Sequence, residues 1–389
     1  MDFYLPEDVR QLQDTVRKFV DRELIPIEMH SMEDAADGTP DLKPGIRADL
    51  EKKAKALGLW HLEVPEEYGG AGLGLLAQVV IWEELGRTVA LPNRGPGVFG
   101  PEVRPLLFTI SDEQKKRYLH PLLNGEKRTA FAQTEPDAGA DPGMMRTTAV
   151  RKGDHYVING TKRFISHAGT ADFLQLVAAT DRAKGSRGGL SMFLVDMDTP
   201  GVTIVRKIKK MMGDVTYELA FDEVKVPVEN LIGREGEGMR QAQTWITAGR
   251  LRQGSGALGC AVRCIEMASS YAQQRVTFGA PLSERQAIQF MIAESFMEVE
   301  LGRTYTRQAA WKYDRGDLAR HESYVAKIFC TEAGFKASDR CMQIHGGSGL
   351  TDDLPIARMW KNRRSMMITE GAVEVMRMVL AREIFRMHR

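Results

Sequence analysis

The sequence is poor in cysteine and carries almost no net charge. Its four cysteines among 389 residues lack the paired CxxC spacing of a zinc site, so neither a disulfide scaffold nor a zinc fold is indicated, and a reducing compartment fits best. The 53 basic residues balance 52 acidic ones to a net charge of +1, which disfavours nucleic-acid binding. Hydrophobic residues (43%) and charged residues (27%) are in the proportions of a globular protein, which excludes a mainly disordered chain.

Long apolar runs are also missing. No stretch reaches the roughly 18 uninterrupted apolar residues of a membrane span, and the opening MDFYLPEDVR does not resemble a signal peptide. We therefore expect a cytoplasmic protein without a membrane span. No GxSxG elbow or HExxH motif occurs, and the eight histidines do not cluster at metal-ligand spacing. Serine hydrolysis and zinc chemistry are disfavoured, and we expect no metal site.

The spacing of the apolar residues changes twice along the chain. Up to about residue 127 it is helical and no strand is expected; the predicted helices cover 9–24, 47–57, 73–86 and 112–123. Runs rich in β-branched and aromatic residues then predict strands over 129–134, 155–159, 173–179, 190–195 and 217–226. In the last run the apolar positions shift from odd to even, which predicts a bulge or turn at Asp222-Glu223. After Gly238 the helical spacing returns.

This order of helices, strands and helices predicts an α+β fold, because a doubly wound parallel sheet would need strands and helices to alternate throughout. We expect an N-terminal helical domain over 1–127, a middle β domain over 128–234 and a C-terminal helical bundle over 235–389. The densest charge run, RKIKK at 206–210, is expected to be a solvated loop edge.

Two short patterns have simple structural explanations. Residues 72–77 satisfy GxGxxA, but no strand precedes them, so a dinucleotide-binding site is not expected. Cys260 and Cys264 share one helix face, but no histidine or carboxylate completes a ligand set. We expect these cysteines to pack in a core.

Three segments are more informative. Residues 131–141 (FAQTEPDAGAD) predict a strand end that can receive a planar heterocycle, although an ordinary strand-to-loop transition fits equally well. Residues 274–281 (QRVTFGAP) place Arg275 and Phe278 at a turn; the guanidinium suits a phosphate, and the alternative is a surface arginine near a buried phenylalanine. In the third segment, the glycines of QIHGGSG at 343–349 allow backbone to approach a ligand closely.

Glu370 follows that segment and lies in a locally apolar stretch, MMITEGAV. An isolated carboxylate among apolar residues is a candidate general base. The alternative is a glutamate in the first turn of a helix, where it would complement the helix dipole.

Together these segments resemble the acyl-CoA dehydrogenase family over essentially the full length. The matching motifs, in the family's order, are VPEEYGGAGLG, QTEPDAGAD, GTKRFIS, LAFDEVKVPVENLIG, QQRVTFGAPLSERQAIQF, QIHGGSGL and ITEGAVEVMRMVLAR. The resemblance implies an N-terminal helical domain, a middle β-barrel or sandwich domain and a C-terminal four-helix bundle, in agreement with the order read from the spacing.

The resemblance implies FAD-dependent α,β-dehydrogenation of an acyl-CoA thioester to a trans-2-enoyl-CoA. By its match to the ITEG position, Glu370 would be the base for the α proton, and flavin N5 would accept the β hydride. Some relatives place the base on an earlier helix, at the position of Gly249, which cannot serve here. The Glu370 backbone amide and a ribityl hydroxyl of FAD would hold the thioester carbonyl, and Gly371 would leave room for the substrate.

The resemblance also implies a set of FAD contacts. Positions that line the flavin are matched by Phe131, Gln133, Thr134, Phe164 and Ser166. Positions that contact FAD from a neighbouring subunit are matched by Arg275, Phe278, Gln286, Gln343 and Gly347. These matches imply a homo-oligomer, at least a dimer and usually a tetramer. Gln286 has an alternative role, because Ser283 and Gln286 could form a capping box.

The chain departs from the family's usual pattern at several contacts. Ala140 stands where a serine often touches the CoA moiety, and Ala372 and Glu374 stand where a threonine and a glutamine often meet the cofactor. Arg250 matches a substrate-side arginine, with a surface salt bridge as the alternative. The motifs at 278–290 and 343–360 look closer to the branch of the family that takes bulky acyl groups than to the short-chain branch.

An electron-transferring flavoprotein is the electron acceptor that the resemblance implies. An acyl-CoA oxidase or a flavin monooxygenase on the same fold is the alternative; retention of Glu370 argues against the monooxygenase, and slow reoxidation in air would argue against the oxidase. A nucleic-acid-associated flavoprotein of this fold is disfavoured by the net charge.

Overall fold

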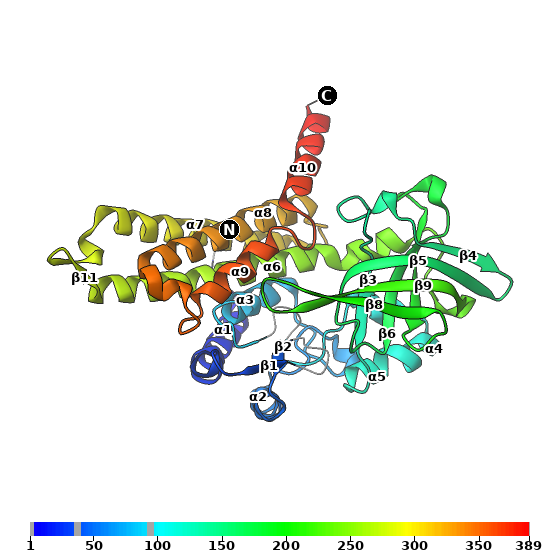
Figure 1. Ribbon diagram of the computed structural model, residues 1–389, viewed down its shortest axis with the longest axis horizontal. Coiled ribbons are helices and arrows are strands. Elements are labelled where there is room, and N and C mark those ends of the chain that lie inside the picture. Colours follow the sequence, from blue (N-terminus) through cyan, green and yellow to red (C-terminus); the bar gives the residue numbers. More distant parts are fainter. Residues whose placement is uncertain (1–3, 35–39, 92–96, 389) are drawn as a thin grey trace. The chain divides into compact units, whose positions relative to one another are not determined.

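The computed structural model describes residues 4–34, 40–91 and 97–388 (Figure 1). The chain forms two compact units. The helical unit comprises Met1–Glu33, Asp41–Gly100 and Thr247–Arg389, and the sheet unit comprises Asp34–Pro40 and Pro101–Ile246. The α+β fold class is confirmed, whereas the three domain boundaries at 127/128 and 234/235 stay predictions.

The four helices expected in the first third of the chain are confirmed. They are α1 (Glu7–Phe19), which continues as a π-helical turn to Leu24, α2 (Pro44–Ala56), α3 (Leu75–Leu85) and a broken run from α4 (Asp112–Gln114) to α5 (His120–Leu123). The expectation of no strand before residue 127 is wrong, because β1 (Met32–Asp34) pairs with β2 (Pro40–Leu42). These strands have three residues each and contain no β-branched residue, so composition gave no signal for them.

The N-terminus of α3 is occupied by a carboxylate of the chain itself. Leu75 N and Leu76 N donate to the two oxygens of Asp314 at 2.6 and 2.8 Å. This helix end therefore has its anion already, as the helix dipole favours. The GxGxxA pattern leads into α3 from a loop, which agrees with the expectation of no dinucleotide site here.

Glycines let α3 approach α6 (Gly238–Gln274) at backbone distance. A Cβ added at Gly259 would lie 1.8 Å from the Glu83 carbonyl oxygen, and one added at Gly86 would lie 2.3 Å from the Gly256 carbonyl oxygen. The two backbones can keep this spacing only while both positions lack a side chain.

We expect Gly259→Ala to lower the free energy of unfolding by roughly 1–3 kcal/mol, the usual cost of overpacking a core. Thermal unfolding followed by circular dichroism measures the loss. The matched control is Gly45→Ala in α2, where an added Cβ meets nothing within 4 Å. Equal melting temperatures for the two variants would contradict the close packing of α3 on α6.

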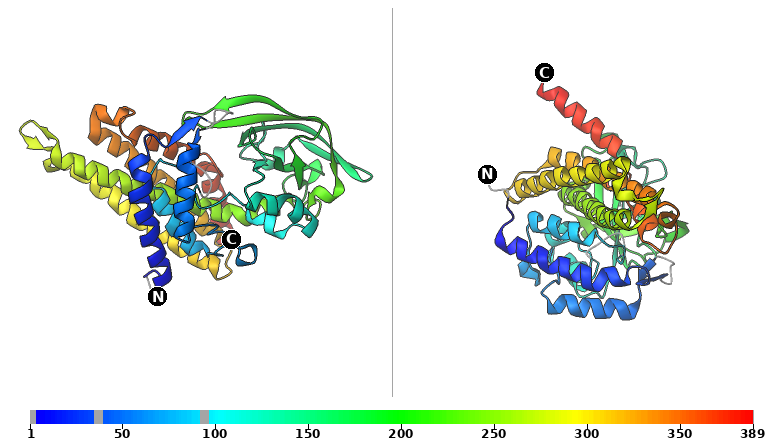
Figure 2. Two further views of the ribbon diagram at one scale, coloured as in Figure 1. Left: turned by 90° about the horizontal axis from the view of Figure 1, so that it is seen from below. Right: turned by 90° about the vertical axis from the view of Figure 1, so that its left-hand side faces the viewer.

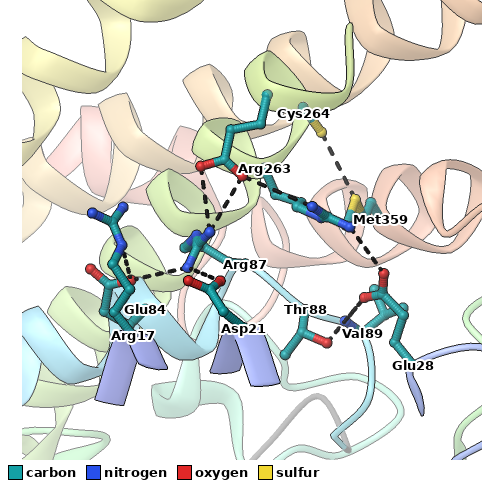
Figure 3. A network of polar contacts seen from close by, with 11 residues as sticks. Arg17, Asp21, Glu28, Glu84, Arg87, Thr88, Val89, Arg263, Cys264 and Met359 are labelled. Carbon is teal, nitrogen blue, oxygen red and sulfur yellow. Dashed lines mark hydrogen bonds and ion pairs between the residues drawn. The ribbon is translucent and has the colours of Figure 1, made fainter. Parts of the chain in front are cut away.

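A buried polar network joins the N-terminal helices to α6 within the helical unit (Figure 3). The buried Arg87 donates to Asp21 at 2.8 Å and to Glu266 at 3.4 Å. The carboxylate of Glu28 accepts from Thr88 Oγ1 at 3.0 Å and from Val89 N at 3.2 Å, and Arg263 lies 3.6 Å from it. Residues of the first 90 positions and residues of α6, distant in sequence, thus share one set of ionic contacts.

The sheet unit is built on one curved sheet (Figure 2, left). Its strands are β3 (Thr129–Ala132), β4 (Thr148–Lys152), β5 (His155–Ser166), β6 (Phe173–Ala179), β7 (Leu190–Asp196), β8 (Val202–Lys209), β9 (Val215–Pro227) and β10 (Leu231–Ile232). Their order is β10-β7-β6-β4-β5-β9-β8, and β3 pairs in parallel with β6. Every residue of β6 is buried, as expected for a strand covered on both faces.

The predicted irregularity at Asp222-Glu223 is confirmed as a β-bulge. Ile158 pairs with Val224 and Gly160 with Phe221, so two residues of β9 face Asn159 alone. Glu223 has a φ of +49° and its amide donates to Asn159 Oδ1 at 2.8 Å. The loop expected at RKIKK is wrong: residues 206–209 belong to the edge strand β8, whose exposed cations protect the edge from pairing with another chain.

The C-terminal helices share one core. Buried residues of α6, α7 (Gln286–Asp314), α8 (Arg320–His345) and α9 (Ile356–Met366) pack together in a four-helix arrangement. All four cysteines are free and buried in this core, which confirms the packing role expected for Cys260 and Cys264. The last helix, α10 (Val373–Met387), buries only Val373 and Met376 and then leads away from the other helices (Figures 1 and 2, right).

Among the described residues, none of the helices combines the length and the apolarity needed to cross a bilayer.

Candidate active site

Glu370 lies in the turn between α9 and α10, which we call the base turn (residues 367–372). Its φ is +56°, and that of Gly371 is +101°, so two consecutive residues occupy the left-handed region. This conformation is costly for a glutamate and is concentrated at functional sites. Glu370 precedes the first helical residue, Val373, so the alternative of a first-turn glutamate is wrong; Glu374 occupies that turn instead.

The base turn is held from two helices of the same unit. Lys327 of α8 donates to the Gly371 carbonyl oxygen at 2.6 Å. The buried amide of Gln253 in α6 lies 3.0 Å from the Thr369 hydroxyl. Orienting that amide so that its nitrogen faces the carbonyls of Met366 and Thr369, at 3.2 and 3.3 Å, lets its oxygen accept from the hydroxyl and satisfies both groups.

The surroundings of Glu370 are less apolar than its sequence neighbours indicate. One carboxylate oxygen, Oε2, is buried without a hydrogen-bond partner. Two cations from other helices, Arg250 and Lys327, lie within electrostatic reach of the carboxylate. The locally apolar stretch of sequence therefore describes only part of the environment, because helices distant in sequence supply charges.

Arg250 lies beside the base turn, as its predicted substrate-side role requires. Its guanidinium carbon lies 4.4 Å from the ring centroid of Tyr324, and a Cβ added at Gly371 would lie 3.8 Å from its Nη2. Burial lowers the pKa of Arg250, and the charges of Tyr324 and Glu370 oppose that shift. A surface salt bridge does not describe this arginine, whose Nε is buried without a partner.

The second group of predicted residues surrounds the end of β3 in the sheet unit. The Thr134 carbonyl accepts from Arg163 N at 2.7 Å, and the Gln133 carbonyl accepts from Lys162 Nζ at 3.0 Å. These contacts place Gln133 and Thr134 beside the stretch of β5 that carries Phe164. The structure thus brings the QTEP and GTKRFIS motifs together.

Phe164 sits on a second bulge. Lys162 pairs with Leu219 and Ile165 with Tyr217, so Arg163 and Phe164 together face one residue of β9. Phe164 has a φ of +60° and a side chain that is 50% exposed. A bulge turns a side chain out of the regular alternation, and here it presents a flat ring to the outside. Ser166 is the last residue of β5.

A tryptophan and an arginine that sequence reasoning missed adjoin Phe131. The ring of Trp245 lies 5.2 Å from that of Phe131, edge to face, and the guanidinium carbon of Arg104 lies 5.1 Å from one ring and 4.9 Å from the other. Neither Arg104 nor Trp245 belongs to a motif, so local spacing gave no signal for them.

A buried ion pair supports the end of β3 and was also missed. Lys162 is fully buried, and its ammonium donates to Glu135 at 2.8 Å as well as to the Gln133 carbonyl. The other donors to the Glu135 carboxylate are Arg146 N at 2.6 Å and Thr147 N at 2.9 Å. Burial opposes ionisation of Glu135, but Lys162 and these amides outweigh it and lower the pKa of the carboxyl.

The third group lies in the helical unit, where the C-terminal ends of α6 and α8 meet. A hollow of about 350 Å³ is lined by residues of both segments expected there, including Arg275 and Gly347. One wall is the buried His345, stacked at 4.4 Å on Tyr271. An added Cβ at Gly347 meets nothing within 4 Å, so backbone is open to a ligand there.

Three other predicted residues lie around this hollow without lining it. Phe278 is fully exposed at the tip of the hairpin formed by β11 (Val276–Thr277) and β12 (Ala280–Pro281), so the alternative of a buried phenylalanine is wrong. Gln343 is exposed on α8. Gln286 is the exposed first residue of α7 and the capping residue is Arg285, so the proposed capping box is not formed.

A helical unit with a four-helix core, a sheet unit and these residue groups can be compared with known proteins, and the comparison identifies the family. The chain matches the acyl-CoA dehydrogenase N-terminal domain over residues 6–126, the middle domain over 130–224 and the C-terminal domain over 236–385. The chain therefore belongs to the acyl-CoA dehydrogenase family, whose members are flavoproteins, and it is an oxidoreductase of the acyl-CoA dehydrogenase class.

Individual relatives match almost end to end. The mitochondrial short-chain specific acyl-CoA dehydrogenase of Homo sapiens is 36% identical over 388 residues, which covers 99% of this chain and 92% of that protein. The caffeyl-CoA reductase-Etf complex subunit CarC of Acetobacterium woodii is 33% identical over 387 residues, covering 97% of this chain and 98% of that protein. The structure of a glutaryl-coenzyme A dehydrogenase with glutaryl-CoA superposes with a TM-score of 0.86 at 33% identity, covering 98% and 96% of the two chains.

Proposed function

We propose that this chain oxidises an acyl-CoA thioester to its trans-2-enoyl-CoA with FAD as cofactor and Glu370 as base. The observation that carries the proposal is the Glu370 carboxylate, held in a left-handed turn with one buried oxygen left unpaired. A base needs an acceptor atom without a competing donor, in a position that the turn fixes before the substrate arrives.

The reaction breaks one C–H bond at the α carbon and one at the β carbon and forms a C=C bond. Glu370 takes the α proton onto its free oxygen, while its backbone amide donates to the thioester oxygen, where negative charge develops. Bound FAD would supply the two-electron acceptor for the β hydrogen. Gly371 leaves space beside the base, and Arg250 presents its guanidinium next to that space.

The residues present fit FAD. The hollow beside Arg275 and Gly347 offers a guanidinium for phosphate oxygens and an open glycine backbone, and His345 and Tyr271 supply flat surfaces. In the sheet unit, Phe131, Gln133, Thr134, Phe164 and Ser166 would line the flavin. The remaining contacts proposed for the cofactor come from Phe278, Gln286, Gln343, Ala372 and Glu374, and Ala140 would face the CoA moiety.

A homo-oligomer and an electron-transferring flavoprotein complete the proposal. A fully exposed phenylalanine at a turn position of positive φ is costly for an isolated chain, and Phe278 has both features. Contact with a second copy would cover it. The relative CarC is named as a subunit of an Etf complex, which supports transfer of the electrons to such a partner.

The decisive experiment is an anaerobic titration of the purified protein with short, long, branched and aromatic acyl-CoAs, followed by the visible absorption of the flavin. We expect one class to bleach the flavin and to leave the enoyl-CoA as product. A yellow protein that no thioester bleaches would contradict the proposed reaction. Fast reoxidation of the bleached protein in air would favour the oxidase. The human relative is short-chain specific, so the expectation of a bulky substrate rests on the sequence motifs alone.

Arg275→Ala is expected to lower FAD retention about tenfold or more, because a phosphate contact by a guanidinium contributes about 1.5–3 kcal/mol. Flavin absorbance per protein after gel filtration measures retention, and light scattering measures the assembly. Arg315→Ala, at an exposed arginine of the same unit, is the control. Full occupancy in an unchanged oligomer would remove the phosphate role of Arg275.

A further inference from the structure

Lys327 is a buried cation for which neither the motifs nor the resemblance provides a role. Its side chain is fully buried in α8, within the run VAKIFC, and its ammonium donates to the Gly371 carbonyl oxygen at 2.6 Å. Burial of an ammonium is expensive unless acceptors and anions compensate. The contacts of the Lys327 ammonium should therefore show what its burial provides.

The group that Lys327 holds is the carbonyl of Gly371, the residue directly after the candidate base. The regular helix ends at Met366 and the next begins at Val373, and both Glu370 and Gly371 have positive φ. A bond to the Gly371 carbonyl fixes the peptide plane between Gly371 and Ala372, one residue beyond Glu370. It thereby limits the directions in which the Glu370 side chain can leave the turn.

The charges around Lys327 come from three helices and the base turn. Burial lowers the pKa of Lys327 to about 8, Glu370 opposes this shift, Arg250 of α6 adds to it, and Glu374 of α10 and Glu332 of α8 oppose it more weakly. The ammonium is therefore charged at neutral pH. Of the anions, Glu370 is the one to which Lys327 couples most strongly.

We propose that Lys327 is a positioning residue for Glu370: its ammonium donates to the Gly371 carbonyl and thereby fixes the turn that carries the Glu370 carboxylate. This inference rests on the proposed function, because it assigns Lys327 a part in the proton transfer to Glu370. Lys327 does not touch the substrate, so it acts through Glu370 alone.

Three substitutions of Lys327 test this role. Lys327→Met removes donor and charge, Lys327→Gln keeps a donor without charge, and Lys327→Arg keeps both. Lys336→Met is the matched control, since that lysine lies on the same helix with a side chain that is 56% exposed. For each holoenzyme, the rate of flavin reduction by a saturating acyl-CoA is measured anaerobically from pH 5 to 10, together with KM, FAD content and melting temperature.

We expect Lys327→Met to lower the limiting rate of flavin reduction roughly 10- to 100-fold with little change in KM, because a base displaced by about 1 Å loses that much. Lys327→Gln keeps a donor on a shorter side chain, so it should lose less of the rate than Lys327→Met. Lys327→Arg keeps most of the wild-type rate, and the control matches wild type throughout.

An unchanged limiting rate in folded, FAD-loaded Lys327→Met would overturn the inference. If the methionine variant does not fold, the Gln and Arg variants decide: a lower limiting rate at unchanged KM in Gln, with recovery in Arg, supports the inference, and wild-type rates in both overturn it. If no acyl-CoA reduces the wild-type flavin, it is the proposed function that fails, and this result is recognised before any variant is made.

Discussion

Glu370→Gln is expected to lose roughly 10²- to 10⁴-fold in the rate of flavin reduction by acyl-CoA, the usual contribution of a positioned base. The amide has nearly the shape of the carboxylate but cannot take up the α proton. Because the backbone of the turn is held by Lys327 and Gln253, we expect FAD content and acyl-CoA affinity to stay near wild type. Anaerobic stopped-flow measurement of the flavin absorbance checks the rate.

Glu113→Gln is the control for this experiment, because that side chain is 84% exposed in α4 and far along the chain from the motifs. A rate near wild type in Glu370→Gln would move the base to another residue. Since Gly249 cannot replace it, such a result would require a base that neither the resemblance nor the geometry identifies.

Lys162→Met is expected to lower the free energy of unfolding by about 3–5 kcal/mol, the cost of leaving a buried charge without its partner. Glu135, only 4% exposed, would keep two backbone donors and lose its cation. The same change releases the Gln133 carbonyl, so FAD retention should fall with stability. Chemical denaturation and flavin absorbance per protein measure the two effects.

The dependence on pH provides an internal check. The folded state lowers the pKa of Glu135 below its ordinary value of 4.5, so the pair contributes stability above that pH and loses it as the pH falls through the folded value. The difference between wild type and Lys162→Met should therefore be largest near pH 7 and shrink toward pH 4. In the double variant Lys162→Met/Glu135→Gln no charge is left unpaired, and part of the loss should be recovered. A constant difference from pH 7 to pH 4 would contradict the ionised pair.

Sequence patterns predicted the longer elements that have a clear apolar pattern and missed elements that are short or charged. The shift of apolar positions before Val224 located the bulge at Asp222-Glu223, because a register change moves side chains to the other face. The strand β8 was missed because its charged residues were interpreted as a solvated loop. In an edge strand such cations prevent pairing with another chain. The strands β1 and β2 are too short to show any alternation.

The residues of the candidate site also fall into two groups, those that could be named from the sequence and those that could not. Motif residues such as Glu370, Gly371 and Arg250 could be named in advance because the resemblance supplied them, and the structure brings these three together. Lys327 and Lys162 could not, since their acceptors lie 44 and 27 to 29 residues away along the chain. Lys327 alone gave a signal, a single lysine inside the apolar run VAKIFC, whereas Lys162 stands beside Arg163 in a polar stretch.

Asp314 makes α3 a helix that carries its own counter-ion. A phosphate that binds this helix end would have to displace the Asp314 carboxylate. Because Asp314 belongs to the same chain, its effective concentration at the helix end does not depend on the protein concentration. The glycine spacing that precedes α3 therefore matches a dinucleotide motif in sequence, while the amides that a phosphate would use there already donate to Asp314.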